Sequence, residues 1–492
     1  MTKTCVPISG DSAGAARKMA DEAISSGANL VEIRADLIAD IDPATIKKHF
    51  SDILGVSIIT LRSKAEGGKS ELTGANREKW LMKALELGAA FTDLEHDADK
   101  KLLHNLRNRG TRVIASKHFL GDWKIEEIDR TLSECCSTGG IGKVAATTRD
   151  AMEGISLLDA RKSAGSSRFS LMGMGEGAEI TRALAGSIGS ELAFCALDKG
   201  KSVAKGQLTL EEQRRILLDD RIVVGLIGHP LGHTLSPRIH NAAFRKMKLP
   251  GIYLTFDIPY AEQIPNFMRR SAKLRVRGFN VTIPYKEVAF SAMDSLDDEA
   301  RRAKAVNTVL VQEDGALKGF NTDIFGFSES LRAAGYDPRN KRALIIGAGG
   351  ASRAAVIALW RMGAKIIIAN RTPERAEELV KSMRVFVKTI PLDAVEQEKP
   401  FGLIVNATPV GMRGFETAPI VPESLIEKAE AVMDMVYNPM ETPLLAAAKT
   451  HGVKMIHGLD MLLFQGAKAF EIWTGFKAPV EIMKCQLMEA IG

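Results

Sequence analysis

The sequence predicts an α/β protein built from two successive parts, a closed (β/α)8 barrel and then a pair of smaller α/β domains. The chain has 492 residues, too many for one hydrophobic core, because single domains usually hold roughly 100–200 residues. Short β-like runs also alternate with amphipathic helical segments along most of the chain, a pattern typical of α/β folds.

The first part is predicted to be a barrel because its β-like runs number eight. They are Thr4–Ile8, Leu30–Asp36, Val56–Ser63, Phe91–His96, Arg112–Phe119, Ile141–Thr147, Arg168–Met174 and Glu191–Leu197. Amphipathic segments such as 13–26 and 77–87 lie between them. Eight strand–helix units within about 200–250 residues match a (β/α)8 barrel. An open doubly wound sheet is the alternative that this pattern leaves.

The second part is expected to begin near residue 219. A polar helical segment at 209–220 ends the first pattern, and a new strand starts at Arg221–Gly228. Strand–helix alternation is expected to continue to about Asp323, and a helix over 324–334 then leads into a turn at 335–338. Another unit starts with the strand Arg342–Ile346, and the stretch 458–491 is helical. We therefore expect domains at 1–218, 219–330 and 331–457.

Composition argues against several classes of protein. The formal net charge of +6 comes from 66 basic and 60 acidic residues, and a solvated surface explains so small an excess without nucleic acid. The 5 cysteines are odd in number and show no metal-binding spacing, which favours a reducing cytoplasm. The N-terminus has no apolar signal region, and no apolar run approaches the ~20 residues of a membrane span. We expect small-molecule substrates and no nucleic-acid or membrane partner, while the oligomeric state stays open.

A glycine-rich turn marks a dinucleotide-binding domain of the Rossmann type. The strand Arg342–Ile346 runs directly into Gly347-Ala-Gly-Gly-Ala-Ser, which opens a helix. Glycines let the backbone approach a pyrophosphate, and the free N–H groups of a helix N-terminus bind it. Ser352 replaces the third glycine of the usual G-x-G-x-x-G pattern, but the strand before the turn and the helix after it support the interpretation.

The following strand indicates which dinucleotide is bound. The run Lys365–Ala369 ends in Asn370-Arg371-Thr372, and Arg375 follows closely. An enzyme that prefers NAD usually carries an acidic residue here for the ribose 2′-hydroxyl, whereas guanidinium groups suit a 2′-phosphate. NADP is therefore favoured, and a surface arginine pair at a helix start is the alternative.

Polar side chains gather at three further places in the second part. The loop after residue 228 carries hydroxyls and imidazoles, including the run His233-Thr-Leu-Ser-Pro. An extended run from Asn280 places Thr282 on the same face and ends at Lys286, and two Asn-Thr pairs follow at 307–308 and 321–322. Together these groups suit the binding of a polyol.

This half resembles shikimate dehydrogenase across about 222–490. The resemblance rests on His-Thr-Leu-Ser-Pro, Asn-Val-Thr-Ile-Pro-Tyr-Lys, Ala-Val-Asn-Thr, Gly-Phe-Asn-Thr-Asp, Gly-Ala-Gly-Gly-Ala-Ser-Arg, Asn-Arg-Thr, Asn-Ala-Thr-Pro-Val-Gly-Met, Asp-Met-Val-Tyr-Asn-Pro and Gly-Leu-Asp-Met-Leu-Leu-Phe-Gln. It implies that Lys286 and Asp323 are the catalytic pair and that helices within 458–492 complete the 219–330 domain. It implies these substrate-binding residues: Thr234, Ser236, Thr282, Asn307, Tyr437 and Gln465. It implies these NADP-binding residues: Gly347, Ala348, Gly349, Gly350, Ala351, Asn370, Arg371, Thr372, Arg375, Thr408, Gly458 and Met461.

The implied pair suits the reduction of a ketone. A carboxylate beside Lys286 keeps the ammonium charged, and the ammonium then donates a proton to the developing alkoxide. Thr234 departs from the serine that is more common in this family, and its added methyl narrows the carboxylate end of the pocket. The choice between shikimate and quinate therefore stays open.

In the barrel, chemistry is expected where the strands end, at their carboxyl side. Glu32, Arg34 and Asp36 share one face of the second strand, and Lys143 lies within the sixth. Burial lowers the pKa of a lysine and frees its amine to attack a carbonyl, and His118 on the fifth strand suits movement of the α-proton. A core lysine held in an ion pair is the alternative.

The barrel half resembles type I 3-dehydroquinate dehydratase across about 1–218. The resemblance rests on Glu-Ile-Arg, Thr-Leu-Arg with Glu-Gly-Gly, Ser-Lys-His-Phe, Gly-Lys-Val-Ala and Met-Gly-Met-Gly. It implies that Lys143 forms the Schiff base, that His118 is the general acid and base, and that Glu66 orients His118. It implies these substrate-binding residues: Glu32, Arg34, Arg62, Arg182 and Gln207. The segment Val203-Ala-Lys-Gly-Gln departs from the common Ser-Ala-Pro-Gly-Gln, and Ala193 stands where a threonine is often found.

Together the halves predict a bifunctional enzyme of the shikimate pathway. The barrel would eliminate water from 3-dehydroquinate, and the second half would reduce the product with NADPH. No metal is expected, because the imine replaces a Lewis acid. One alternative is quinate or shikimate oxidation in catabolism. The other is a non-enzymatic regulator that senses these metabolites, against which the presence of Lys143, His118, Lys286 and Asp323 argues.

Overall fold

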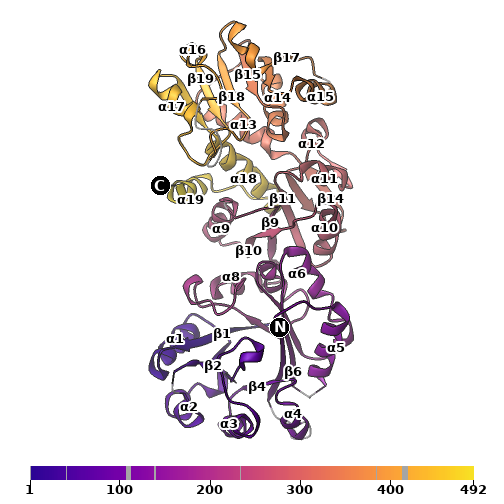
Figure 1. The fold of residues 1–492 in the computed structure, drawn as a ribbon, viewed down its shortest axis with the longest axis vertical. Coiled ribbons are helices and arrows are strands. Elements are labelled where there is room, and N and C mark those ends of the chain that lie inside the picture. The colour runs from indigo at the N-terminus through magenta and orange to yellow at the C-terminus, as the bar shows by residue number, and fades with distance from the viewer. Residues whose placement is uncertain are drawn as a thin grey trace. The chain divides into compact units, whose positions relative to one another are not determined.

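The computed structural model describes residues 2–39, 41–106, 112–137, 140–232, 234–383, 385–412 and 419–491 (Figure 1). By its internal contacts the chain forms two compact units. The first unit is Met1–Val223 with Phe256–Pro259 and Lys273–Arg275, and the second is formed by the remaining segments from Val224 to Gly492.

The first unit contains an eight-stranded parallel sheet. Its strands are β1 (Lys3–Gly10), β2 (Leu30–Ile38), β3 (Ser57–Thr60), β4 (Phe91–Glu95), β5 (Val113–Phe119), β6 (Ile141–Thr147), β7 (Phe169–Met174) and β8 (Leu192–Phe194). Each strand from β1 to β7 pairs with its neighbour in the chain, and β8 lies beside β1. This order confirms the predicted barrel and excludes the open doubly wound sheet.

The seam between β7 and β8 is joined by side chains as well as by backbone. The backbone N–H of Glu191 donates to the Phe169 carbonyl at 2.6 Å. The hydroxyls of Ser170 and Ser190 accept from the amides of Leu192 and Leu171 at 3.0 and 3.1 Å. The barrel therefore closes at this seam through a small set of hydrogen bonds instead of a regular ladder.

Helices follow the strands of the barrel (Figure 1). They are α1 (Ala13–Ser25), α2 (Pro43–Phe50), α3 (Gly74–Glu86), α4 (Lys100–Leu106), α5 (Ile125–Cys136), α6 (Ala151–Leu158), α7 (Ala178–Ala183) and α8 (Leu210–Ile216). Several begin at side-chain caps that local sequence supplies. Asp42 and Asp150 accept from the third amide of their helices, and Thr209 forms a capping box with Glu212.

The second unit begins with a mixed six-stranded sheet in the order β10-β9-β11-β13-β14-β12. Its strands are β9 (Ile222–Gly228), β10 (Gly251–Asp257), β11 (Val276–Val281), β12 (Ser295–Leu296), β13 (Thr308–Val311) and β14 (Leu317–Phe320). Its helices are α9 (Ser236–Lys246), α10 (Ile264–Lys273), α11 (Lys286–Ser291), α12 (Asp298–Ala303) and α13 (Thr322–Ala333).

The expectation of strand–helix alternation up to Asp323 is wrong at one place. Strands β13 and β14 are antiparallel and follow one another directly. The turn between them contains Gly315 at φ +85°, and the Gly315 amide donates to the carbonyl of Gln312. Glycine adopts this left-handed conformation without strain, so the local sequence forms a hairpin where a helix was expected.

A fully parallel sheet follows in the order β17-β16-β15-β18-β19-β20. Its strands are β15 (Arg342–Ile346), β16 (Lys365–Asn370), β17 (Lys388–Pro391), β18 (Leu403–Asn406), β19 (Ala431–Asp434) and β20 (Lys454–His457). Its helices are α14 (Gly350–Arg361), α15 (Pro373–Met383), α16 (Glu423–Ile426) and α17 (Pro443–Thr450). Alternate residues of β15 enter two separate hydrophobic clusters, so apolar side chains pack on both faces of this sheet, as a doubly wound Rossmann sheet requires.

Two helices end the chain, α18 (Gly458–Thr474) and α19 (Val480–Ile491). They pack on the mixed sheet's domain, where α19 contacts α9 and α18 contacts α13. The indole N–H of Trp473 donates to the Val309 carbonyl in β13 at 2.9 Å. Among the described residues, none of the helices is long and apolar enough to cross a membrane.

Candidate active sites

The barrel holds a cavity of about 330 Å³ where the strands end. All eight residues that the sequence predicted for this half line it: Glu32, Arg34, Arg62, Glu66, His118, Lys143, Arg182 and Gln207. They come from β2, from the segments after β3 and β8, from β5 and β6, and from α7. Below them the barrel interior is apolar, with Cys5, Ile58, Ile114 and Ile141 in one cluster. The charged side chains are therefore held at the carboxyl ends of the strands by a dry core.

Lys143 is buried and ion-paired. Its Nζ lies 3.1 Å from Asp93 Oδ2 and 3.4 Å from Glu32 Oε1, and 4.1 Å from the ring centroid of Phe194. Lys143 therefore forms ion pairs in the core, as the alternative interpretation expected. The same side chain also lines the cavity. Burial alone would raise the pKa of Asp93, but Arg62 and Lys143 lower it to about 2. A permanent carboxylate therefore lies beside the amine.

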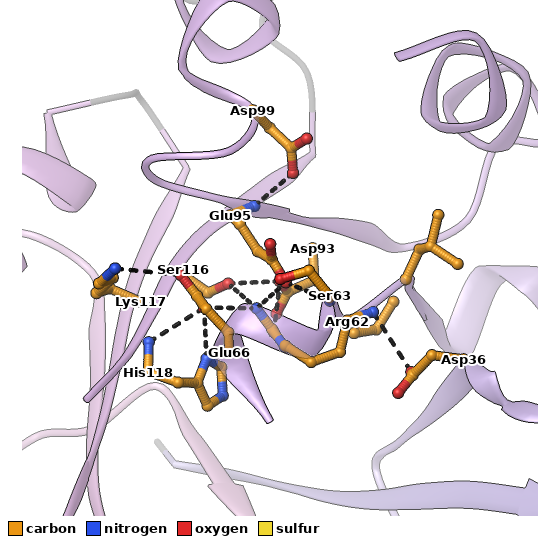
Figure 2. A network of polar contacts seen from close by, with 12 residues as sticks. Asp36, Arg62, Ser63, Glu66, Asp93, Glu95, Asp99, Ser116, Lys117 and His118 are labelled. Carbon is orange, nitrogen blue, oxygen red and sulfur yellow. Dashed lines mark hydrogen bonds and ion pairs between the residues drawn. The ribbon is translucent and has the colours of Figure 1, made fainter. Parts of the chain in front are cut away.

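Arg62 stands at the centre of a polar network (Figure 2). Its Nη1 donates to Glu66 at 3.1 Å and to Glu95 at 3.2 Å, and its Nη2 donates to Asp93 at 2.8 Å. The three carboxylates come from two segments of the chain and would repel one another without this guanidinium. Arg62 thus neutralises the acidic side of the cavity, in addition to lining it.

His118 and Glu66 form a close pair. Glu66 Oε2 lies 3.0 Å from His118 Nδ1 and accepts the backbone N–H of His118 at 3.1 Å. Burial raises the pKa of Glu66 to about 7, although Arg62 opposes it. Burial lowers the pKa of His118 well below its ordinary value, and the nearby cations, Arg62 first, act in the same direction. The imidazole is therefore neutral near pH 7 and is held at a fixed orientation.

Arg182 is a buried cation whose guanidinium donates to backbone carbonyls. Its Nη1 donates to the Phe194 carbonyl at 2.8 Å and its Nη2 to the Gly173 carbonyl at 2.9 Å. In the part of the chain that the structure describes, no carboxylate forms an ion pair with it, and burial lowers its pKa to about 10. A buried guanidinium in a cavity is a site for a carboxylate of a ligand.

The segment after β8 closes one side of this cavity. Val203, Ala204 and Gln207 line it, and Gln207 Oε1 accepts from the Val203 amide at 3.0 Å. Lys205, which stands where the family commonly has proline, pairs with Glu176 in the segment after β7. The substitution thus introduces an ion pair between the two segments at the mouth of the barrel.

Sequence reasoning assigned no role to two acidic residues of this site. Asp93 contacts both Lys143 and Arg62, and Asp36 binds Arg34 through both oxygens at 2.9 and 2.8 Å. Asp36 also accepts the backbone N–H of Lys69, which ties the segment after β3 to β2. The sequence named Asp36 among the polar residues of the second strand without giving it a role, and the same criterion could have found Asp93 in β4.

The second unit holds a cavity of about 220 Å³. All eight substrate and catalytic residues predicted for this half line it: Thr234, Ser236, Thr282, Lys286, Asn307, Asp323, Tyr437 and Gln465. Three residues of the predicted cofactor set, Ala351, Gly458 and Met461, line the same cavity. His233 of the predicted loop lies outside the described residues.

Lys286 and Asp323 are in direct contact. Lys286 begins α11 and its Nζ lies 2.5 Å from Asp323 Oδ2, in the first turn of α13. Asn307 Nδ2 donates to the other carboxylate oxygen at 2.8 Å, and Asn307 Oδ1 accepts the Thr322 amide at 2.7 Å. Both carboxylate oxygens are thus engaged, which holds the ammonium at the cavity wall.

A second layer of hydrogen bonds supports Asn307. The buried hydroxyl of Tyr253 donates to Asn280 Oδ1 at 2.8 Å, and Asn280 Nδ2 donates to the Asn307 carbonyl at 3.1 Å. The sequence singled out Asn280 by its position in the extended run, but nothing in the sequence pointed to Tyr253 in β10. Only the order of the sheet, in which β10 and β11 lie on either side of β9, brings the two side chains together.

The glycine-rich turn has the open shape that a dinucleotide needs. Gly347 has φ +108°, and a Cβ there would lie 2.8 Å from Thr408 Cγ2. Gly349 and Gly350 face open space, and α14 begins without a side-chain cap. The amides of its first turn are therefore available to a phosphate. Ser352 is fully buried where the third glycine would pack against the sheet.

The end of β16 presents positive charge. Arg371 and Arg375 are exposed, and among the described residues neither has an acidic side chain within ion-pair distance. Asn370 Nδ2 donates to the Thr372 carbonyl at 2.7 Å and shapes the turn between them. This arrangement fits a 2′-phosphate, as NADP requires.

Comparison with known proteins supports the family resemblance of both halves. The family described as type I 3-dehydroquinase matches residues 4–221, and the shikimate dehydrogenase substrate binding domain matches 226–309. The shikimate/quinate 5-dehydrogenase family matches 331–410, and the shikimate 5′-dehydrogenase C-terminal domain matches 458–488. A bifunctional 3-dehydroquinate dehydratase/shikimate dehydrogenase of Arabidopsis thaliana, described as chloroplastic, is 32% identical over 97% of this chain and 83% of its own length.

The chain belongs to the bifunctional 3-dehydroquinate dehydratase/shikimate dehydrogenase family. It carries a dehydratase domain and an NADP-type shikimate dehydrogenase, as the sequence predicted.

Single-function relatives cover the dehydrogenase half. A shikimate dehydrogenase (NADP(+)) of Archaeoglobus fulgidus is 42% identical over 55% of this chain and 99% of its own length. A Thermus thermophilus shikimate 5-dehydrogenase, solved with NADP(H) and shikimate, is 39% identical, with a TM-score of 0.50, over 55% of this chain and 99% of that one.

Proposed function

We propose that the dehydratase converts 3-dehydroquinate to 3-dehydroshikimate through an imine at Lys143, and that the dehydrogenase reduces this product to shikimate with NADPH. The observation that carries the first step is a buried amine and a neutral imidazole in one cavity with a guanidinium that forms no ion pair among the described residues. The contact between Lys286 and Asp323 beside the cofactor turn supports the second step.

In the dehydratase, the substrate carboxylate binds Arg182, and Glu32 and Arg34 hold hydroxyl groups. The Lys143 amine attacks the ketone and water leaves as the imine forms, with Asp93 beside the nitrogen throughout. The imine then accepts the electrons released when Nε2 of His118 removes a proton from the adjacent carbon. The hydroxyl one carbon further leaves as water with a proton returned to it, and hydrolysis of the imine frees Lys143.

In the dehydrogenase, NADPH when bound supplies the hydride. The Lys286 ammonium donates its proton to the carbonyl oxygen, and Asp323 holds the ammonium in place. Thr282, Asn307 and Gln465 are assigned to substrate hydroxyls, and the assigned carboxylate-binding residues are Thr234, Ser236 and Tyr437. The turn 347–351 and the 370–375 segment would hold the cofactor, together with Thr408, Gly458 and Met461.

The cytoplasm remains the proposed compartment. All five cysteines are free in the structure, which suits a reducing environment such as the cytoplasm or a chloroplast stroma. Fractionation of source cells with an antibody to the protein decides between them, and recovery with plastids would overturn the cytoplasmic proposal.

Borohydride trapping tests the imine. Wild-type protein treated with 3-dehydroquinate and borohydride is expected to gain one covalent adduct that peptide mapping places on Lys143. Lys143→Ala is expected to lose dehydration and keep the dehydrogenase rate, whereas Lys286→Ala is expected to do the reverse. An active wild-type protein that forms no adduct would exclude the imine route.

The substrate preference is tested separately. Thr234 carries the one feature that favours quinate, because its methyl alters the pocket at the carboxylate end. We expect kcat/KM to be higher for shikimate than for quinate. Equal or better use of quinate would favour the catabolic alternative.

A further inference from the structure

One lysine of the dehydratase network has no place in the mechanism above. Lys117 lies in β5 between Ser116 and His118, and its Nζ is 3.6 Å from Glu66 Oε1 (Figure 2). The same Nζ lies 2.5 Å from Asp97 Oδ2. Its side chain is about a quarter exposed, and Asp97 is at the surface. Lys117 therefore connects a surface carboxylate to the buried Glu66–His118 pair.

We propose that Lys117 is a positioning residue that keeps Glu66 ionised and thereby keeps His118 in the tautomer that accepts a proton from the substrate. The inference rests on the proposed function, in which His118 is the base.

The geometry of the pair makes the charge of Glu66 decisive. As a carboxylate, Glu66 Oε2 accepts two hydrogen bonds from His118, one from the backbone N–H and one from Nδ1–H. Nε2 then carries the lone pair that removes a proton. A protonated Glu66 would donate to Nδ1 instead, which moves the imidazole hydrogen to Nε2 and removes the base.

The groups around Glu66 act in opposite directions. Burial raises its pKa to about 7, Arg62 and Lys117 lower it, and Glu95 and Asp93 raise it. The positive charge of Arg62 is shared among three carboxylates, because Arg62 also contacts Glu95 and Asp93. Lys117 faces the oxygen of Glu66 that Arg62 does not contact.

Two neighbouring carboxylates keep Lys117 positively charged. Burial acts to lower its pKa, but the contacts with Asp97 and Glu66 raise it. Four nearby cations lower the pKa of His118 and so disfavour its protonated form: Arg62, Lys143, Arg34 and Lys117. The first proton taken up on acidification therefore goes to Glu66, and Lys117 opposes its uptake.

The test is the pH profile of dehydration in the full-length protein. Lys117→Met keeps roughly the length of the side chain and removes its charge. The acidic limb of the pH profile of kcat is then expected to shift to higher pH by about one pH unit. The rate well below the limb should fall about tenfold, and the rate above it should match the wild type. Lys117→Arg should restore the wild-type profile.

A matched control comes from the same segment. Lys64, in the short helix that ends at Glu66, is exposed and pairs with Glu71, so Lys64→Met removes one charge without touching Glu66. Its profile is expected to match the wild type. The dehydrogenase rate of each variant reports how much protein is folded.

An unchanged limb in Lys117→Met, or a loss of rate that is equal at every pH, would overturn the inference. Failure of the proposed function has a different signature, because Lys143→Ala would then retain dehydration whatever Lys117 does.

Discussion

Replacing Arg182 with methionine should abolish dehydration without unfolding the barrel. The guanidinium is 4% exposed, donates to the carbonyls of Phe194 and Gly173, and has no carboxylate partner among the described residues. A buried charge of this kind lowers the stability of the folded protein and is typical of a ligand-binding group. The variant therefore separates the energy of folding from the energy of binding.

The magnitude follows from the pKa of Arg182, which burial lowers from its ordinary value to about 10. At about 1.36 kcal/mol per pH unit, this corresponds to roughly 3 kcal/mol for holding the charge in the folded state. Below pH 10 the group is charged in both the folded and the unfolded chain, so the cost is fully present at pH 7. Methionine removes this cost and forfeits two hydrogen bonds of roughly 1 kcal/mol each.

The net change in the free energy of unfolding is therefore expected to be small, within about 1 kcal/mol of the wild type. The loss on binding should be larger, because a desolvated guanidinium–carboxylate contact contributes roughly 3 kcal/mol, or more than a hundredfold in kcat/KM. Hydrogen exchange of amides in β7 and β8 measures local stability. Absorbance of the conjugated product measures dehydration.

The result that would refute this reasoning is the opposite pattern. If protection in β7 and β8 fell by more than about 2 kcal/mol while kcat/KM fell less than tenfold, Arg182 would be a structural residue and the substrate carboxylate would bind elsewhere. The dehydrogenase rate of the same sample controls for the amount of intact protein.

Three further changes test the dehydrogenase. Arg371→Gln with Arg375→Gln should raise KM for NADPH about a hundredfold and leave KM for NADH unchanged, because the two exposed guanidiniums form no other ion pair among the described residues; an equal effect on both cofactors would contradict this. Tyr253→Phe leaves buried Asn280 Oδ1 without its donor, so kcat for shikimate oxidation should fall about tenfold while KM for NADP stays constant. A wild-type kcat would show that Tyr253 does not act through Asn307. Thr234→Ser removes one methyl and should change the quinate-to-shikimate ratio of kcat/KM by about tenfold, and an unchanged ratio would show that Thr234 does not set the preference.

The regular elements were predictable because their signals are local. The strand Arg342–Ile346 was predicted with the bounds that the structure gives, since an apolar run ends at Gly347. The hairpin of β13 and β14 was missed, because two four-residue strands show too few alternations to be told from a loop. The glycine that forms its turn was visible, but a glycine alone does not specify which strands pair.

The proposed reacting groups were selected for a different reason. Lys143 and His118 are chemically distinctive at the ends of barrel strands, and Lys286 and Asp323 lie in specific motifs. Tyr253 and Lys117 carry no such signal, because each acts through a neighbour that is far away along the chain.

The sequence by itself determined the family and the two folds and predicted which groups react, because residue type and order carry this information. Only the tertiary structure decided the state of those groups. Three features depend on distances between separate segments of the chain. They are the burial that raises the pKa of Glu66, the three carboxylates around Arg62, and the burial that lowers the pKa of Arg182. Electrostatic energies follow those distances and the removal of water, and packing alone sets both.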